Sequence, residues 1–230
     1  MLSRSLELTG YACLAAMIAL GIGTGCLAET PPTAQTDCAS PLGNKDVAKV
    51  ETAIGDLAAD AVRNLLRTDI ALIAASELKP KDPPLPAGKI LLSDIKPLVS
   101  YPDDPLAVLE LTGKAVKQAL ERSVAINPQP NLGFLQVSGL QFTFDLRKPS
   151  GSRVTSVNVG GAPIKEDANY TVAVTNSVAN GALGYWKVWD QDKVKITRKP
   201  DATVVKAVEA LFKANPKIDY SKLDRISPVK

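Results

Sequence analysis

The stretch Phe134-Leu-Gln-Val-Ser-Gly-Leu-Gln-Phe-Thr-Phe-Asp145 is the most regular pattern in this chain of 230 residues. Apolar and polar side chains alternate along it, as they do in a strand with one buried face. We therefore predict one long strand over residues 134–146. A half-buried strand needs a covering layer, so the fold depends on the segments that surround it in sequence.

Three segments have the pattern of amphipathic helices. In residues 47–65, apolar side chains recur at three- and four-residue steps, and Asn44 or Asp46 is placed to cap such a helix. Thr112 is predicted to cap a second helix, and Asp201 to cap a third that ends at Asn215. These helices lie near both ends of the sequence and offer the apolar faces that a sheet needs.

Short apolar runs between the helices predict further strands. Two adjacent glycines, Gly160 and Gly161, are suited to a turn between two of them. Together with the alternating stretch, these runs predict an α+β fold in which helices cover layers of mixed β-sheet. The predicted strands are residues 70–74, 106–111, 154–159, 170–174 and 194–197.

The N-terminus has the features of an export signal. Residues 8–28 carry no charged side chain and contain an apolar core of signal-peptide length. Cleavage after Ala28, lipidation of Cys26 and retention as a membrane anchor all remain open. Each places the remaining chain outside the cytoplasm, secreted or periplasmic, with a membrane attachment only through this leader.

The rest of the chain divides into a linker and one domain. Residues 29–45 are rich in Pro, Thr and Ser and predict a linker, and residues 46–230 predict a single domain. After cleavage at Ala28, Cys38 is the one remaining cysteine. It stands among polar residues, so we expect an exposed thiol without an internal disulfide.

The composition excludes several kinds of chemistry. The chain contains no histidine, which rules out Ser-His-Asp and Cys-His catalysis and histidine-ligated zinc. Its net charge is +3, and the charges alternate in sign without a long basic run. We therefore expect no catalytic residue, no metal site, no cofactor and no nucleic-acid partner.

Five segments carry a resemblance to a known family. Residues 51–63 are similar to E-x-x-x-G-N-L-x-x-D-A-x-R, and residues 109–121 to E-L-T-G-x-x-L-x-x-x-L-E. Residues 134–145 contain F-L-Q-V-S-G, residues 153–172 continue the pattern, and residues 179–185 are similar to A-x-G-G-D-G-[FY]. In this order and spacing they resemble the C-terminal domain of the 5′-nucleotidase / UDP-sugar hydrolase family.

The resemblance implies a substrate-binding domain. Family members hydrolyse nucleotides with an N-terminal calcineurin-like domain that holds two metals through Asp, His and Asn, and they bind the nucleoside with the C-terminal domain. Only the leader and linker precede residue 47 here, and histidine is absent. We therefore expect a standalone C-terminal-like domain that is not active as a hydrolase by itself.

The family's nucleoside-binding positions differ in this chain. The family has N-x-G-G-I-R where this sequence has Ala74-Ala-Ser-Glu-Leu-Lys79, and P-F-x-N where it has Tyr101-Pro-Asp-Asp104. The second stacking Phe corresponds to Ser177, and the ribose-binding Asp corresponds to Leu183. The candidate ligand-binding residues that follow are Ser76, Lys79, Tyr101, Asp104, Ser177, Asn180 and Tyr185.

These changes predict a degenerate nucleoside site. Stacking on an aromatic ring is worth about 1–3 kcal/mol per base, and both ring positions are altered. We expect an exported, non-catalytic binding or accessory module whose partner is a nucleoside-like small molecule or a separate metallophosphatase chain. Two alternatives remain: a component of a nucleotide or nucleotide-sugar hydrolase, and a structural envelope protein.

Overall fold

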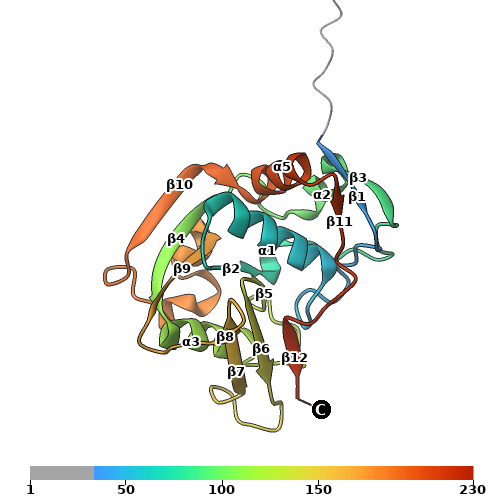
Figure 1. The fold of residues 1–230 in the computed structure, drawn as a ribbon. Coiled ribbons are helices and arrows are strands. Elements are labelled where there is room, and N and C mark those ends of the chain that lie inside the picture. The colour runs from blue at the N-terminus through green and yellow to red at the C-terminus, as the bar shows by residue number, and fades with distance from the viewer. Residues whose placement is uncertain (1–33, 230) are drawn as a thin grey trace, which may run out of the picture. The chain divides into compact units, whose positions relative to one another are not determined.

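A five-stranded mixed sheet forms the centre of the fold (Figure 1). The structure, a computed structural model, describes residues 34–229. The predicted cleavage site at Ala28 and lipidation at Cys26 lie outside these residues. The sheet pairs β2 with β9 in parallel and its other neighbours antiparallel. Its order is β10 (Ile196–Thr203), β4 (Pro105–Thr112), β9 (Asn169–Thr175), β2 (Ile70–Ala74) and β5 (Leu135–Ser138).

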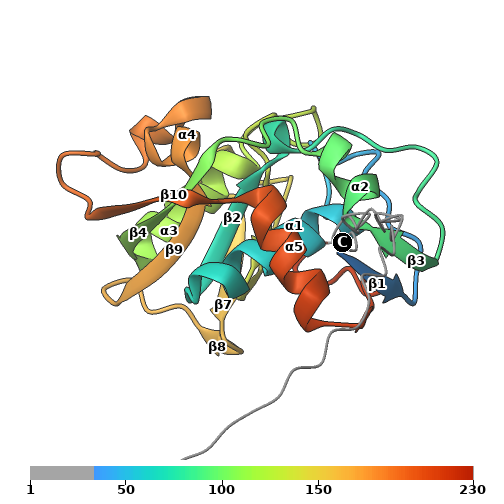
Figure 2. The ribbon, with the colours of Figure 1, turned by 90° about the horizontal axis from the view of Figure 1, so that it is seen from above.

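Helices cover this sheet, which confirms the α+β prediction. Helices α1 (Ala53–Leu66) and α5 (Val204–Ala214) lie side by side across it (Figure 2). Helix α3 (Gly113–Ser123) packs against β4. The short helical segments are α2 (Leu92–Ile95), α4 (Asn176–Ala179), η1 (Ala75–Glu77), η2 (Lys96–Leu98) and η3 (Ala182–Lys187). Within residues 34–229, no helix has the length and apolar character needed to cross a bilayer.

The alternating stretch is two strands, so the prediction of one long strand is wrong. Gly139 separates β5 from β6 (Leu140–Phe144), and these strands belong to different sheets. Its φ is +79°, and a Cβ at this position would lie 2.0 Å from the carbonyl oxygen of Asp69. Only glycine permits this close approach together with a left-handed backbone, and the chain bends here.

The second sheet joins distant parts of the chain. Its order is β12 (Ile226–Pro228), β6, β7 (Val154–Val159) and β8 (Ala162–Pro163). Gly160 and Gly161 form the predicted turn, but the turn leads from β7 into the short strand β8 instead of directly into β9. A hairpin therefore projects from the domain where the sequence predicted a simple connection.

The linker prediction over residues 29–45 is wrong for part of that range. A third sheet contains β1 (Gln35–Cys38) between β3 (Gly88–Leu91) and β11 (Lys217–Ile218). Cys38 is buried, with 2% of its surface exposed, so the expectation of an exposed thiol is also wrong. Both partner strands come from distant sequence, which the local composition does not show.

The caps of two helices differ from those predicted. Helix α1 begins at Ala53, where the hydroxyl oxygen of Thr52 accepts a hydrogen bond from Gly55 N at 3.1 Å. Helix α5 is capped in the same way by Thr203, not by Asp201. In contrast, Thr112 caps α3 as predicted and accepts a bond from Ala115 N.

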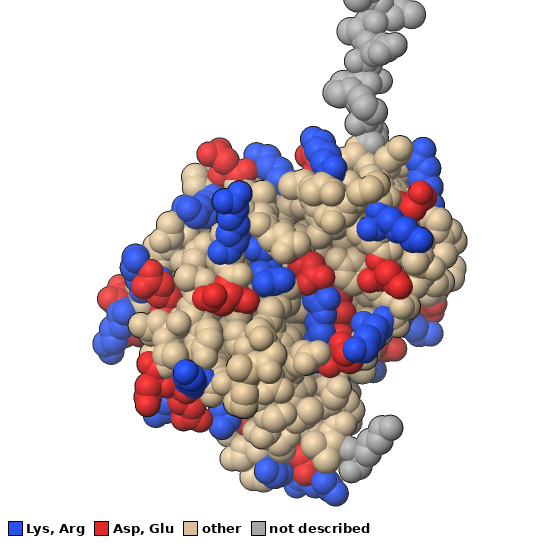
Figure 3. All heavy atoms as spheres, in the orientation of Figure 1, with Lys and Arg blue, Asp and Glu red and all other residues tan. Residues whose placement is uncertain are grey.

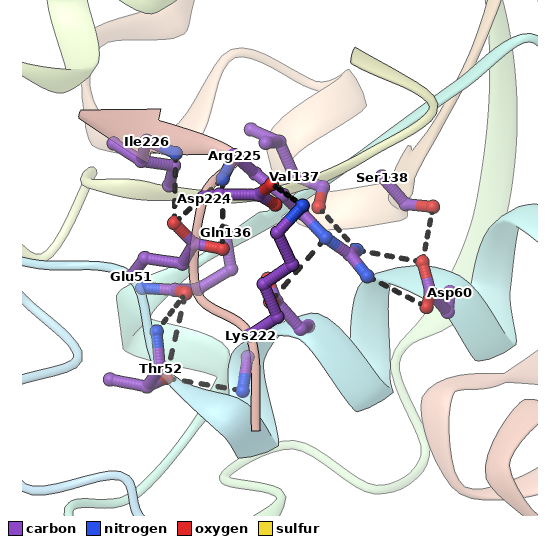
Figure 4. A network of polar contacts seen from close by, with 12 residues as sticks. Glu51, Thr52, Asp60, Gln136, Val137, Ser138, Lys222, Asp224, Arg225 and Ile226 are labelled. Atoms are coloured by element: carbon purple, nitrogen blue, oxygen red, sulfur yellow. Dashed lines mark hydrogen bonds and ion pairs between the residues drawn. The ribbon is translucent and has the colours of Figure 1, made fainter. Parts of the chain in front are cut away.

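A buried glutamine fixes the start of α1 on the sheet (Figure 4). The side chain of Gln136 on β5 accepts a hydrogen bond from Thr52 N at 3.0 Å. It donates to the carbonyl oxygens of Val47 at 3.0 Å and Val50 at 2.8 Å. These bonds hold the turn before the extended residue Thr52, so the helix cannot extend back to Asn44.

The same helix also holds the C-terminal segment. Glu51 accepts hydrogen bonds from the backbone N–H groups of Arg225 and Ile226 (Figure 4). The guanidinium of Arg225 donates two bonds to Asp60, at 2.7 and 2.9 Å. A bidentate pair of this kind combines charge with fixed geometry. Strand β12 is thereby tied to α1 as well as to β6.

Gly55 is predicted to tolerate no side chain. A Cβ there would lie 2.2 Å from Gln136 Oε1, and the three hydrogen bonds of that amide prevent it from moving aside. We expect Gly55→Ala to lower the free energy of unfolding by about 2 kcal/mol or more. Urea titration measures the change. Gly43→Ala is the matched control, because its Cβ meets Pro84 at an ordinary 3.6 Å. Equal stability of the two variants would contradict this role of Gln136.

Candidate functional site

The candidate site lies where three central strands end or begin on one edge of the sheet. Strands β2 and β9 run in parallel, so η1 and α4 leave the sheet at the same edge. Strand β4 is antiparallel to β9 and begins at this edge. We call the residues gathered there, Ser76, Glu77, Asp104, Thr175 and Ser177, the strand-end site. Ligands commonly bind beyond the carboxyl ends of parallel strands.

The structure places Ser177 against Asp104, and it places Ser76 just after the neighbouring strand β2. The backbone N–H of Ser177 donates to Asp104 Oδ2 at 3.3 Å. Ser76 follows β2, and its N–H donates to the carbonyl oxygen of Leu132 at 3.0 Å. Ser177 is exposed, and Ser76 and Asp104 are partly exposed. This placement leaves all three available to a ligand.

The sequence prediction missed Glu77, the residue at the centre of this site. Glu77 is 2% exposed, and its Oε1 accepts a hydrogen bond from the Thr175 hydroxyl at 3.2 Å. Its Oε2 has no hydrogen-bond partner among residues 34–229. Burial and the nearby charge of Asp104 raise the pKa of Glu77 to about 7, and the bond from Thr175 opposes this shift. The carboxyl group therefore changes charge near neutral pH.

Two other predicted residues lie at the margin of the site. Lys79 is exposed, and no ion pair of its ammonium group is found among the described residues. Asn180 follows α4, and its side-chain oxygen accepts a bond from Arg198 Nη2 at 2.9 Å. Arg198 also donates to Asn176, so this guanidinium anchors both ends of α4. Asn180 thus has a structural partner already.

Tyr185 is placed differently from the prediction. Its ring is completely buried, and its hydroxyl donates to the carbonyl oxygen of Gly133 at 2.6 Å. The ring stacks on Trp189, with centroids 5.1 Å apart and planes at 14°. Packing in the interior makes Tyr185 unavailable to a ligand, so it is removed from the candidate set.

Two exposed apolar side chains, Tyr101 and Leu132, flank the strand-end site, and a third, Trp186, is exposed on η3. Tyr101 is 58% exposed, Leu132 64% and Trp186 64%. Leu132 is bonded through its backbone to Ser76, and Tyr101 is bonded to Asp104 in a turn. Large apolar side chains that remain in water mark surfaces that bind ligands or other proteins. The sequence indicated Tyr101 but not Leu132.

The described residues contain no cluster suited to a metal ion. In residues 34–229, no group of three or more His, Cys, Asp or Glu side chains lies close enough to hold one. The face drawn in Figure 3 carries basic and acidic side chains interspersed, without a broad area of one sign. The site can accept hydrogen bonds and present apolar contacts, but it offers no ligand set for a metal.

Comparison with known proteins agrees with the fold. Residues 32–190 match the family model described as "5′-nucleotidase, C-terminal domain". Over 183 residues the chain is 28% identical to an apyrase of Aedes albopictus, in a match that covers 74% of this chain and 30% of that protein. It is 33% identical to the 5′-nucleotidase of Homo sapiens over 92 residues, 36% of this chain and 16% of that protein.

Solved structures show the same architecture. The 5′-nucleotidase precursor from Thermus thermophilus superposes with a TM-score of 0.76 at 26% identity, over 85% of this chain and 39% of that chain. The NAD nucleotidase of Haemophilus influenzae shares the fold, with a TM-score of 0.71 at 15% identity over 85% and 38% of the two chains. The present chain therefore spans less than half the length of these relatives. Because the family model matches most of its residues, the chain belongs to the 5′-nucleotidase C-terminal domain family.

Proposed function

We propose that this chain is a ligand-binding module that does not itself hydrolyse nucleotides. The observation that carries this proposal is the set of possible metal-binding side chains. The sequence has no histidine, and the described residues hold no cluster of three metal-binding side chains. Metal-assisted phosphoester hydrolysis needs ions that position and activate the attacking water. Hydrolysis therefore requires groups that residues 34–229 do not supply.

The strand-end site is proposed to bind nucleosides weakly. Ser177 provides no ring where the family motif has a stacking Phe, and Leu183 provides no carboxylate for a ribose hydroxyl. Glu77 and Asp104 place two carboxyl groups in the strand-end site. Like charges oppose a phosphate group in this environment. The exposed Tyr101 and Leu132 leave apolar contacts for a small ligand.

A second function is action as an accessory to a separate metallophosphatase chain. The exposed apolar side chains around the strand-end site favour it, because such a surface also suits a protein partner. Export is part of both proposals and rests on the uncharged residues 8–28. A structural envelope protein remains the third possibility if neither a ligand nor a partner binds.

The first test is direct measurement of hydrolysis. We expect the purified chain to release no phosphate from AMP or UDP-glucose with Mn²⁺ or Co²⁺ present, because its residues 34–229 supply no cluster of metal ligands. Colorimetric phosphate detection provides the readout, with a known 5′-nucleotidase as the positive control. A rate of phosphate release above that of the metal ion alone would refute the non-catalytic proposal, provided that this activity copurifies with the chain through two columns.

The second test restores an aromatic ring to the strand-end site. Ser177 is exposed, so a larger side chain can be accommodated there. Ser177→Phe is expected to raise the affinity for adenosine by about 5- to 100-fold, the range that one stacking contact provides. Calorimetry measures the change, and Ser152→Phe in an exposed loop is the matched control. Micromolar binding of adenosine by the unaltered chain would contradict a weakened site.

The third test concerns the charge of Glu77. Its pKa is raised from 4.5 to about 7 in the folded chain, so the protonated form stabilises the fold at low pH. That contribution is lost as the pH rises through about 7. We expect wild-type stability to fall relative to Glu77→Gln by about 2 kcal/mol between pH 5 and pH 8.

Urea unfolding at the two pH values measures this difference. Glu209→Gln provides the control, because Glu209 lies on the surface of α5 and pairs with Lys213. A parallel pH dependence of wild type and Glu77→Gln would show that Glu77 is not buried in the manner described.

A further inference from the structure

A polar cleft of about 650 Å³ lies away from the strand-end site. One wall is the C-terminal part of α1 with the chain that leads into β2, and the other is the hairpin formed by β6, β7 and the glycine turn. None of the residues of the strand-end site lines it. Its polar side chains include Arg63, Asp69, Gln141, Asn158, Asp224 and Arg225.

The floor of the cleft is a chain of paired polar groups (Figure 4). Ser138 donates to Asp60 at 2.5 Å, and Asp60 accepts two bonds from Arg225. Arg225 Nη1 also donates to the carbonyl oxygen of Val137 at 3.0 Å, and its Nε lies 3.4 Å from Asp56. The Asp60 and Arg225 side chains are therefore occupied by each other and by the protein.

Among the described residues, Arg63 is the basic residue of this cleft whose guanidinium group still has N–H groups without a partner. Its Nε donates to Ser138 Oγ at 2.8 Å, whereas its two terminal nitrogens have no hydrogen-bond or ion-pair partner within residues 34–229. Its side chain passes over Gly139, where a Cβ would lie 2.9 Å from Arg63 Cδ. Contact with Gly139 and Ser138 fixes the side chain and leaves the planar end of the guanidinium free. That end matches the two oxygens of a carboxylate or phosphate.

The opposite wall carries two side-chain amides. Gln141 on β6 and Asn158 on β7 are directly paired in register, so both side chains lie on the same face of the sheet. Neither amide has a hydrogen-bond partner in the part of the chain that the structure describes. Each can both donate and accept, which suits hydroxyl or peptide groups of a ligand.

The remaining charges limit the kind of anion that fits. Asp69 lines the cleft, and its Oδ2 accepts bonds from Thr171 N and the Thr171 hydroxyl at 2.8 and 2.7 Å. Asp224 also lines it and pairs with Lys222. Three acidic and two basic residues therefore line the cleft, which opposes ligands of high negative charge.

We propose that this cleft binds a small ligand that carries a single carboxylate. The carboxylate pairs with the free end of Arg63, and the amides of Gln141 and Asn158 bond the polar body of the ligand. A sugar acid and the C-terminus of a short peptide share this chemistry. The site is separate from the strand-end site, so it adds a second binding function that does not depend on nucleoside binding.

The test uses the chain labelled with ¹⁵N and two probes, glucuronate and alanyl-alanine, with glucose as the neutral control. Gly139, Gly160 and Gly161 line the cleft, so their amide resonances report binding locally. We expect one or both carboxylate probes to shift these resonances in a saturable manner, and glucose to leave them unchanged. Saturation by one probe alone identifies the sugar or peptide source.

Substitutions then test the assigned groups. Arg63→Gln is expected to weaken binding of the effective probe about tenfold or more, since charge-assisted bidentate bonds are lost. Arg147→Gln is the charge-matched control, because Arg147 is exposed and pairs with Asp145 outside the cleft. If Arg63→Gln does not fold, the double variant Gln141→Ala/Asn158→Ala tests the opposite wall, where no side-chain bond is lost.

Three results would overturn the proposal. The first is the absence of saturable shifts with both carboxylate probes. The second is unchanged affinity in Arg63→Gln or, where that variant is unfolded, in the double amide variant. The third is inorganic phosphate binding as tightly as the carboxylate probes, which would remove the discrimination expected from Asp69 and Asp224.

Discussion

The contact between Gln136 and the start of α1 is the constraint on which the rest of the structure depends. The amide of the buried Gln136 satisfies one N–H and two carbonyl groups of residues 47–52. Unpaired, these groups would each cost free energy, so the turn and the strand stabilise each other. Gly55 allows the two elements to meet because it has no side chain. Once α1 is fixed in this way, Glu51 and Asp60 are in place to hold Arg225 and the C-terminal strand. The first and third family motifs are thus two sides of one contact.

The sequence predicted those elements whose determinants are local. Thr112 caps α3 because its hydroxyl reaches an N–H three residues away, and such a signal is visible in the sequence. The start of α1 was predicted too early, because Val47 and Val50 continue the helical spacing while Gln136, 84 residues from Thr52, holds them in turns. The burial of Cys38 was missed for a similar reason. Its strand is completed by residues 88–91 and 217–218, so its environment is set by tertiary pairing.

Matching motifs in the sequence can give the backbone position of a candidate site residue but not the direction of its side chain. Matching the family motifs indicated Ser76, Asp104 and Ser177, which lie next to strand ends on one edge of the sheet. The same matching made Tyr185 a candidate ligand-binding residue, although its ring turns inward and stacks on Trp189. Glu77 was noted only as the replacement of a glycine. A charged residue directly after a fully buried strand was the available signal, but its orientation toward Thr175 depends on β9, which is distant in sequence.

The glycine-rich loop after α4 shows that backbone shape and ligand chemistry are separable in this chain. Leu183 occupies the position of the family's aspartate and has a left-handed φ of 58°, a conformation that leucine adopts at a cost. The loop keeps this conformation because Arg122 donates to the carbonyl oxygen of Leu183 at 2.6 Å. A Cβ at Gly184 would lie 2.8 Å from Arg122 Nε, so that residue must remain small. The loop is therefore held by Arg122 and by the absence of a side chain at Gly184. Leucine in place of the aspartate leaves the fold intact, so the family match reports the fold and does not by itself transfer the family's substrate to this chain.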